Sequence, residues 1–316
     1  MIECKLFQGK PLAEKLRSLE ELRKHTDKII WIDNRDSAGN TEFEVLPLVD
    51  AYWKGQLYSD LEVYNRELIC NRLHSDFFVR HYGIDDLQFT PGVPLPASPE
   101  ERHKIELGWN VGFGNYLNLG SVEEMLKLYI LKTAPLPRFI DACSPRDIDV
   151  HCRFRGGGEP VYQRHRADMR QRISDMPIES TSETPVPRKQ FVQEMRRAKI
   201  VVSPFGWGEI CYRDFEAVLN GACLVKPSVS HLSTWPNIFH EHESYVPVRW
   251  DLADLSDTIR ELLDDSDRRL QIAQSAQATL QEVYSERGLA NFTNLQSDRL
   301  TALIHKTTTD RSILPR

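Results

Sequence analysis

Several features that would assign a function directly are missing from this sequence. It has no apolar run of roughly 18 residues, the length that a membrane-spanning helix needs. Its N-terminus lacks the long apolar stretch of a secretory signal peptide, and we find no internal repeat and no low-complexity tract. These absences predict a soluble, cytoplasmic protein, with at most peripheral contact to the inner face of a membrane.

Paired cysteines and metal-binding motifs are also lacking. The cysteines are scattered, without a C-x-x-C pair: Cys4, Cys70, Cys143, Cys152, Cys211 and Cys223. Several fall in predicted strands or on an apolar helix stripe, so we expect buried free thiols in a reducing compartment. No Asp-x-Asp pair stands convincingly at the end of a strand, since the pair at Asp147 and Asp149 precedes one. We therefore expect neither a metal nor another cofactor.

The charge balance argues against a nucleic-acid partner. The net charge is −6 and the pI is about 6.0. Basic and aromatic residues alternate between residues 59 and 82, but no known nucleic-acid-binding motif accompanies them. At 316 residues, the chain is long enough for two domains, each with a sizeable core.

The most informative stretch of the chain is residues 200–227, which reads as strand, glycine loop, helix, turn and strand. The β-branched residues 200–202 predict a strand that is covered on both faces. A proline and two glycines, Gly206 and Gly208, then break the pattern. We predict a helix from Glu209 to about Asn220, followed by a second buried strand.

A helical wheel gathers polar side chains on one face of this predicted helix. Glu209, Tyr212, Arg213 and Glu216 fall together, opposite an apolar stripe. A glycine loop that enters a helix N-terminus exposes backbone N–H groups and suits a phosphate. A carboxylate two turns further on could accept hydrogen bonds from sugar or ribose hydroxyls. The alternative is a solvated helix face with intrahelical ion pairs, and these residues alone do not decide between the two.

The motif Gly-x-Gly-Glu, followed by Arg213, Glu216 and Gly221 before a hydrophobic strand, resembles the donor-binding domain of GT-B glycosyltransferases. It is closest to the group 1 type and to exostosin-like sequences, over about residues 148–285. In those families the second glutamate binds sugar or ribose hydroxyls, a role that the resemblance gives to Glu216. Glu209 stands in the place of the first, as a catalytic candidate. Six residues separate the two glutamates, where retaining enzymes usually have seven, so the role of Glu209 and the stereochemistry stay open.

A second strand, glycine loop and helix add further donor-site candidates. The predicted strand 148–154 ends in the glycines 156–158 and is followed by a basic helix, with Arg153 and Arg155 at the mouth of the loop. In GT-B enzymes this loop supplies a cation to the donor diphosphate, a role that the resemblance gives to Arg155. The alternative is a flexible surface loop with solvated arginines. Lys226 is predicted to lie in a loop that could touch the donor.

Candidates for the acceptor side follow an earlier strand. The predicted strand 28–33 opens into the polar loop 34–40, and ligands of open α/β sheets bind at such carboxyl ends. Asp33 and Asp36 are therefore candidates for the general base of an inverting reaction. Helix capping and turn formation are the alternative for each of them.

These patterns and the resemblance together imply an α/β GT-B fold with two Rossmann-like domains facing a cleft. We expect an acceptor-side domain at residues 1–145, a nucleotide-sugar-binding domain at 146–286, and a C-terminal helix at 287–316 that crosses back to the first domain. Only three or four strands are predicted before residue 145. The first domain is therefore either reduced or without its usual start.

The implied function is transfer of a sugar from a nucleoside-diphosphate-sugar donor to a hydroxyl of a glycan or glycolipid acceptor, in polysaccharide biosynthesis. Donor and acceptor would be the partners. Three alternatives stay open, because a fold does not determine chemistry: a non-catalytic sugar- or nucleotide-binding protein, a nucleotide-sugar epimerase and a hydrolase.

Overall fold

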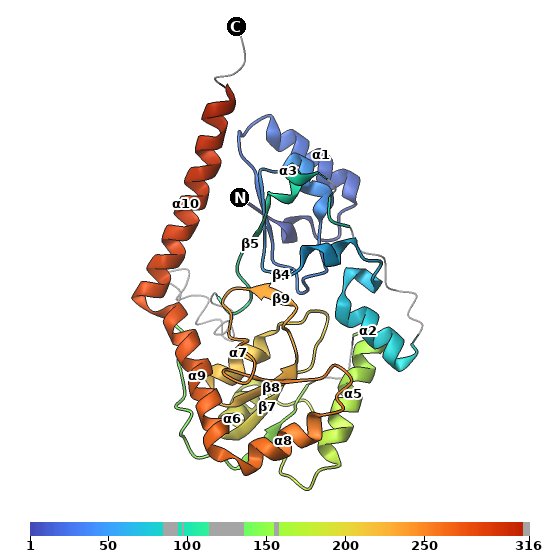
Figure 1. Cartoon of the computed structure of the whole chain (residues 1–316), viewed down its shortest axis with the longest axis vertical. Coiled ribbons are helices and arrows are strands. Elements are labelled where there is room, and N and C mark those ends of the chain that lie inside the picture. The colour runs from blue at the N-terminus through green and yellow to red at the C-terminus, as the bar shows by residue number, and fades with distance from the viewer. Residues whose placement is uncertain (85–93, 97, 114–135, 155–157, 312–316) are drawn as a thin grey trace.

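A computed structural model shows two α/β units stacked along the long axis of the molecule (Figure 1). The structure describes residues 1–84, 94–96, 98–113, 136–154 and 158–311. The first unit contains a sheet in the order β1-β2-β3-β5, and the second contains a sheet in the order β10-β8-β7-β6. A two-stranded sheet, β4-β9, lies between them.

All neighbouring strands of the two larger sheets are parallel. The first sheet is built from β1 (Ile2–Glu3), β2 (Ile30–Asp33), β3 (Ala51–Lys54) and β5 (Ile105–Leu107). The second is built from β6 (Ile148–His151), β7 (Ala198–Val202), β8 (Cys223–Pro227) and β10 (Val246–Val248). Their central strands are rich in β-branched and aromatic residues and are buried, as in sheets that are covered on both faces.

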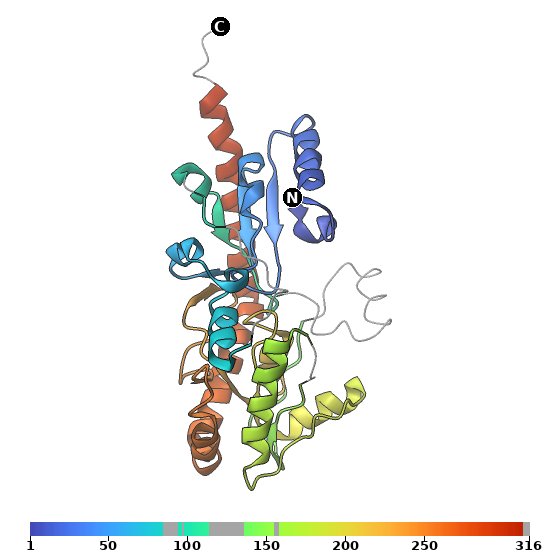
Figure 2. The same cartoon turned by 90° about the vertical axis from the view of Figure 1, so that its right-hand side faces the viewer.

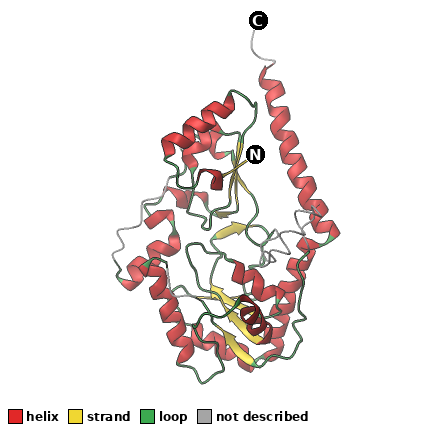
Figure 3. Cartoon of the chain, turned by 180° about the vertical axis from the view of Figure 1, so that it is seen from behind, coloured by secondary structure: helices red, strands yellow, loops and turns green. Residues whose placement is uncertain are grey.

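Helices cover both sheets (Figure 3). The helices are α1 (Leu12–Arg23), α2 (Leu73–Tyr82), α3 (Pro99–Arg102), α5 (Pro160–Ser174), α6 (Arg188–Arg197), α7 (Tyr212–Leu219), α8 (Leu255–Asp264), α9 (Ser266–Tyr284) and α10 (Glu286–Arg311). Short 3₁₀ turns occupy residues 4–7, 43–48, 61–65 and 69–71. Among the helices of the described ranges, none has the length and apolar character to cross a membrane.

Helix α10 returns from the second unit and runs alongside the first (Figures 1 and 2). Leu300 and Leu303 pack against the sheet residue Trp53. Arg299 forms an ion pair with Glu106 at 3.2 Å and donates a hydrogen bond to the carbonyl of Leu107 at 2.9 Å. The end of the chain therefore contacts the unit in which the chain begins.

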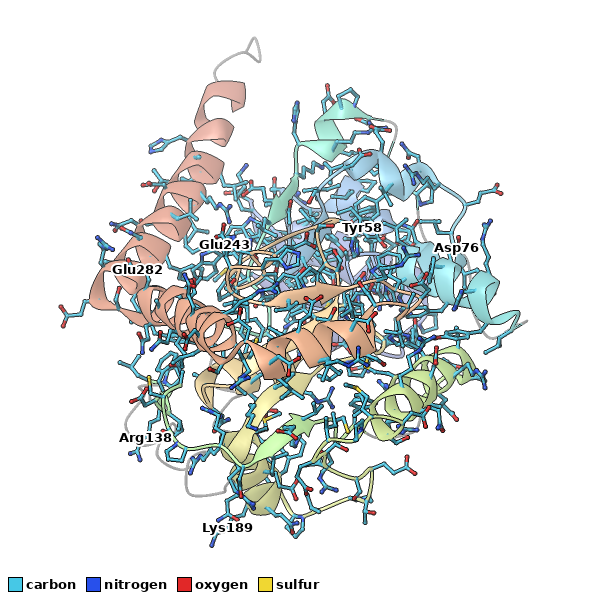
Figure 4. All side chains as sticks on the ribbon, turned by 60° about the horizontal axis from the view of Figure 1, so that its bottom comes forward. Tyr58, Asp76, Arg138, Lys189, Glu243 and Glu282 are labelled. Atoms are coloured by element: carbon cyan, nitrogen blue, oxygen red, sulfur yellow. The ribbon has the colours of Figure 1, made fainter. Side chains whose placement is uncertain are left out.

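The two units are joined by backbone pairing as well as by packing. Strand β4 (Gln56–Tyr58) of the first unit pairs antiparallel with β9 (Leu232–Thr234) of the second. Beside them, the Asn110 side-chain amide donates to the Thr234 hydroxyl at 2.6 Å and to the Pro236 carbonyl at 2.8 Å. Tyr58 lies buried among the dense side chains between the units, whereas Lys189 points outward at the far rim (Figure 4). The junction is thus an integral part of the core.

Two predictions about local structure are wrong. Helix α7 begins at Tyr212, not at Glu209, because Cys211 is its N-cap and the Asp214 carboxylate accepts a hydrogen bond from the Cys211 backbone N–H at 3.0 Å. Glu209 therefore lies in the preceding loop and shares no helix face with Glu216. Lys226 lies within strand β8 and is fully buried, not in a loop.

The expectation of buried free thiols holds for only part of the set. All six cysteines are free. Cys4, Cys152 and Cys223 are buried, whereas Cys143 is exposed.

Candidate functional site

Arginine side chains gather where the strands of the second sheet end. Arg213, in the first turn of α7, and Arg170 of α5 each place their guanidinium carbon 5.6 Å from the ring centre of Phe154. Phe154 follows β6 and directly precedes the glycine loop. A Cβ added at Gly206 would lie only 2.8 Å from the guanidinium of Arg166, so that side chain reaches the glycine loop before α7. Positive charge is therefore concentrated beside the N-terminus of α7.

Arg213 is the least compensated of these cations. Its Nε atom is buried without a hydrogen-bond partner, and among the described residues no carboxylate forms an ion pair with it. The pKa of Arg166 is lowered by burial and next by the charge of Arg213. The residue as a whole is partly exposed, so an anion can reach the guanidinium and supply the partner that its buried Nε lacks.

A neutral histidine lies beside this cationic cluster. His151 ends strand β6 and is fully buried, and neither ring nitrogen has a hydrogen-bond partner. Burial, followed by the charge of Arg213, lowers the pKa of His151 to about 4. The ring is therefore uncharged at neutral pH and adds a hydrogen-bonding group but no charge.

A buried ion pair links the first turn of α7 to strand β8. The Lys226 ammonium lies 2.5 Å from the Asp214 carboxylate and also donates to the backbone carbonyl of Glu209 at 2.7 Å. Asp214 accepts a further hydrogen bond from the Ser203 hydroxyl at 2.5 Å. Because Lys226 is enclosed by this pair, its ammonium is not directed at a donor.

The remaining predicted donor-site residues are spread more widely. Arg153 forms an ion pair with Glu194 of α6 at 2.7 Å. Arg155 lies outside the described residues. Glu216 accepts from Arg188, and Tyr212 is 50% exposed. The structure therefore brings together Gly206 and Arg213, and leaves Arg153 on the side of α6.

Asp33 sits at the centre of a closed ion cluster in the first unit. Its carboxylate accepts two hydrogen bonds from Arg35, at 2.9 and 3.0 Å, and lies 3.3 Å from the Lys54 ammonium. The Tyr52 hydroxyl donates to it as well. Burial would raise the pKa of Asp33, but the charges of Lys54 and Arg35 lower it far below its usual range. The carboxylate has no exposure to solvent, so its role here is structural.

Asp36, in contrast, is exposed between the two units. It lines a cavity of about 400 Å³ together with Lys10 and Trp207, and a smaller one of about 150 Å³ together with Tyr212. A Cβ added at Gly208 would lie 1.7 Å from the Asp36 carbonyl oxygen, so only glycine allows this contact. Asp36 therefore touches the glycine loop that precedes α7.

Glu209 is a buried carboxylate that bridges the two units. Its oxygens accept hydrogen bonds from the Ser37 hydroxyl at 3.1 Å, the Ala38 backbone N–H at 3.2 Å and the Gln56 amide at 3.3 Å. The His74 ring nitrogen Nδ1 lies 3.3 Å away. Burial would raise the pKa of Glu209, but the neighbouring His74 lowers it to about 2.

Sequence reasoning missed three residues of this site: His151, Arg166 and Asp214. Arg166 lies in the helix recognised as basic, but periodicity does not show which of its arginines faces the glycine loop. Asp214 caps the N-terminus of α7, but the N-cap residue is Cys211 and not the usual Ser or Thr. The sequence therefore does not show the usual capping-box pattern. Within the ranges that the structure describes, no three His, Cys, Asp or Glu side chains converge as a metal site.

Comparison with known proteins gives one family match. Residues 137–292 match the family model described as glycosyl transferase-like. No curated protein sequence matches the chain.

Solved structures show weaker similarity. The C-terminal domain of a group 1 glycosyl transferase from Francisella tularensis is 17% identical, with 40% of this chain and 66% of that one covered and a TM-score of 0.29. Anabaena HepE in complex with UDP-glucose is 11% identical, with 92% and 76% covered and a TM-score of 0.45. A UDP-forming trehalose-phosphate synthase from Burkholderia vietnamiensis is 11% identical, with 95% and 72% covered and a TM-score of 0.44.

The family match and the two parallel α/β units agree with the motif that precedes and forms α7. Residues 137–292 belong to the glycosyl transferase-like family, and the chain is a glycosyltransferase of the GT-B type.

Proposed function

We propose that this glycosyltransferase takes its sugar from a nucleoside-diphosphate-sugar donor and transfers it to a hydroxyl of a glycan or glycolipid. The observation that carries the proposal is the uncompensated guanidinium of Arg213 at the N-terminus of α7, with Arg166 close by. A diphosphate supplies the negative charge that this position lacks. As the sugar leaves, charge grows on the diphosphate, and prearranged cations and backbone N–H groups stabilise it.

Glu216 is the proposed contact for the rest of the donor. It lies one helical turn beyond Arg213, and its carboxylate can exchange the exposed Arg188 for ribose or sugar hydroxyls. The neutral ring of His151 is fully buried, so it is not assigned a contact with the donor. Arg155 and Gly208 complete the proposed donor loops. Uridine diphosphate is the first probe to use, and the other nucleotides follow in the screen below.

Asp36 is the proposed general base for the acceptor. It is exposed, lines both cavities between the units and touches the glycine loop at Gly208. A base has to come within hydrogen-bond reach of the hydroxyl that it deprotonates, and Asp36 meets that condition better than the enclosed Asp33. The larger cavity has room for a sugar, and the indole of Trp207 lines it.

The pathway and place of action form part of the same proposal. We assign the chain to polysaccharide biosynthesis in the cytoplasm, with its acceptor at the inner face of a membrane. The family resemblance and the scattered cysteines of the sequence support this assignment.

A binding screen followed by a turnover assay tests the proposal. The melting temperature is measured with UDP, GDP, CMP and ADP and with their common sugar conjugates, because a ligand of the folded state raises it. The proposal predicts a shift with one nucleoside diphosphate and, with an added glycan or glycolipid acceptor, release of that diphosphate together with a glycosylated acceptor. Release with water as the acceptor of the sugar would favour a hydrolase. Binding without release would favour a non-catalytic binding protein. Interconversion of the sugar without release would favour an epimerase, and no shift with any nucleotide would contradict the donor site.

A further inference from the structure

We propose that Glu209 is a positioning residue, whose buried carboxylate holds the loop that carries Asp36 against the glycine loop of the donor site. It would then control acceptor activation from the donor side without touching either substrate. The proposal rests on the proposed function for the meaning of the two loops. It departs from the role of the first glutamate that the sequence resemblance implies.

The hydrogen bonds that the carboxylate accepts come from the first unit. Ser37 and Ala38, which donate to it, are the two residues that directly follow Asp36. Gln56, the third donor, also donates its side-chain amide to the Asp36 carbonyl. Glu209 therefore accepts hydrogen bonds from the two residues that follow Asp36. The Gln56 amide donates both to Glu209 and to the Asp36 carbonyl.

The backbone carbonyl of Glu209 is bound by a residue of the second unit. Its carbonyl accepts from the Lys226 ammonium at 2.7 Å, and Lys226 is paired with Asp214 in the first turn of α7. Asp214 is the neighbour of Arg213 in the chain. A continuous set of buried polar contacts thus runs from Asp214, the residue after Arg213, to the loop of the proposed base.

Burial separates this role from a catalytic one. Glu209 is 1% exposed, and its two oxygens are occupied by the Ser37, Ala38 and Gln56 donors, with His74 beside them. A nucleophile or base has to reach the reacting atoms, which a carboxylate enclosed in this way does not. Gly208 packs directly against the Asp36 carbonyl, so the two loops that Glu209 joins are in contact through their backbones.

The variant Glu209→Gln tests the proposal, because it keeps the size of the side chain and replaces one acceptor oxygen by a donor. The rate of UDP release from UDP-glucose is measured across pH, and UDP affinity is measured by calorimetry. We expect kcat to fall about tenfold or more, since small misplacement of a reacting group is costly. We expect the KM for UDP-glucose and the affinity for UDP to stay within about twofold. The acid limb of the pH profile should remain, because the base is still present.

Ser37→Ala is the second variant, and it tests the same contact if Glu209→Gln does not fold. It removes one of the same hydrogen bonds, so kcat should fall in the same direction by a smaller factor. The kcat of the double variant should lie within about twofold of the kcat of Glu209→Gln alone, because the two residues act through one contact. The exposed Glu243 provides the matched control, and Glu243→Gln should behave as the wild type.

Three results would overturn the proposal: loss of the acid limb in Glu209→Gln, about tenfold weaker UDP binding, or multiplicative effects of the two substitutions. Hydrogen exchange of the amides of residues 36–40 adds a readout that does not depend on the donor. Glu209→Gln should speed this exchange about tenfold or more, and unchanged exchange would contradict the proposal. If the wild type released no UDP, the choice of uridine would fail, while the exchange measurement would still decide the role of Glu209.

Discussion

Glu209 Oε1 lies 3.1 Å from the Ser37 hydroxyl, although 172 positions separate the two residues in the chain. The contact joins the loop after β2 to the loop before α7, one from each parallel sheet. Around it, strand β4 pairs with β9, and Gly208 packs on the carbonyl of Asp36. The two loops of the candidate site are therefore joined by buried polar contacts.

Asp36 and Asp33 should respond differently to the same substitution. Asp36→Asn should lower kcat for UDP release by about 100-fold or more, because a general base typically contributes at least that factor. Its melting temperature should stay close to that of the wild type, since the side chain is exposed. Asp33→Asn should instead destabilise the fold by about 3–5 kcal/mol, because it leaves the fully buried Lys54 ammonium without its carboxylate.

Calorimetric unfolding and steady-state kinetics of the two variants check this pair of outcomes. Wild-type turnover in Asp36→Asn would remove it as the base. Wild-type stability in Asp33→Asn would show that the ion cluster around Asp33 is less important than its burial implies.

The buried pair of Asp214 and Lys226 should be a major contributor to stability. Asp214→Asn leaves a fully buried ammonium without its anion, which typically costs about 3–5 kcal/mol. Asp257→Asn removes an exposed ion pair with Arg260 and should change the free energy of unfolding by less than about 1 kcal/mol. Urea denaturation of both variants makes the comparison, and similar midpoints for the two would contradict the role given to Asp214.

The sequence predicted the parallel-sheet architecture and the region of the site better than the orientation of single residues. Strand β7, the glycine loop and the following helix were recognisable, because buried β-branched runs and glycines are local signals. The start of α7 was not, because its N-cap is Cys211, and moving the start to Tyr212 takes Glu209 off the helix. The ion pair that encloses Lys226 depends on how the strand and helix pack, which no local pattern records.

The first unit shows the same limit. A polar loop after a buried strand predicted a site at Asp33 and Asp36, and both residues do lie at the carboxyl end of β2. Which of the two is exposed depends on Lys54 and Tyr52 of the neighbouring strand, whose side chains enclose Asp33. Strand order and register therefore decide a question that the loop sequence leaves open.

Acid should destabilise the protein through its buried histidines. Burial, followed by the charges of His74 and Arg166, lowers the pKa of His165 to about 3, against about 6.5 in an unfolded chain. The unfolded state therefore binds more protons below pH 6.5, so stability that is present above that pH is lost as the pH falls toward 3. The contribution of His165 at pH 5 is a loss of about 2 kcal/mol.

The variant His165→Phe isolates this contribution, because a phenyl ring can keep the stacking on Phe78. The difference in unfolding free energy between pH 8 and pH 5 should be smaller in the variant by about 2 kcal/mol. An equal difference in both proteins would show that His165 is already protonated in the folded state.

Glu216 should bind the donor, and its present partner Arg188 should compete with it. Glu216→Gln should weaken UDP binding about tenfold, because a carboxylate that accepts hydroxyl hydrogen bonds is replaced by a weaker acceptor. Arg188→Ala, which removes the exposed partner, should leave UDP affinity unchanged or raise it. Calorimetric titration of UDP into the two variants checks both predictions. If only Arg188→Ala weakened UDP binding, Arg188 and not Glu216 would be the contact with the donor.

The most direct test of the donor site is a calorimetric titration of UDP into the wild type and into Arg213→Ala. Arg213 has no anion of its own in the described part of the chain, so its removal should weaken UDP binding about tenfold or more. Arg260→Ala, an exposed arginine on α8, should bind UDP as the wild type does. Equal affinity in Arg213→Ala and the wild type, or no binding of UDP or any other nucleoside diphosphate by the wild type, would contradict the donor site described above.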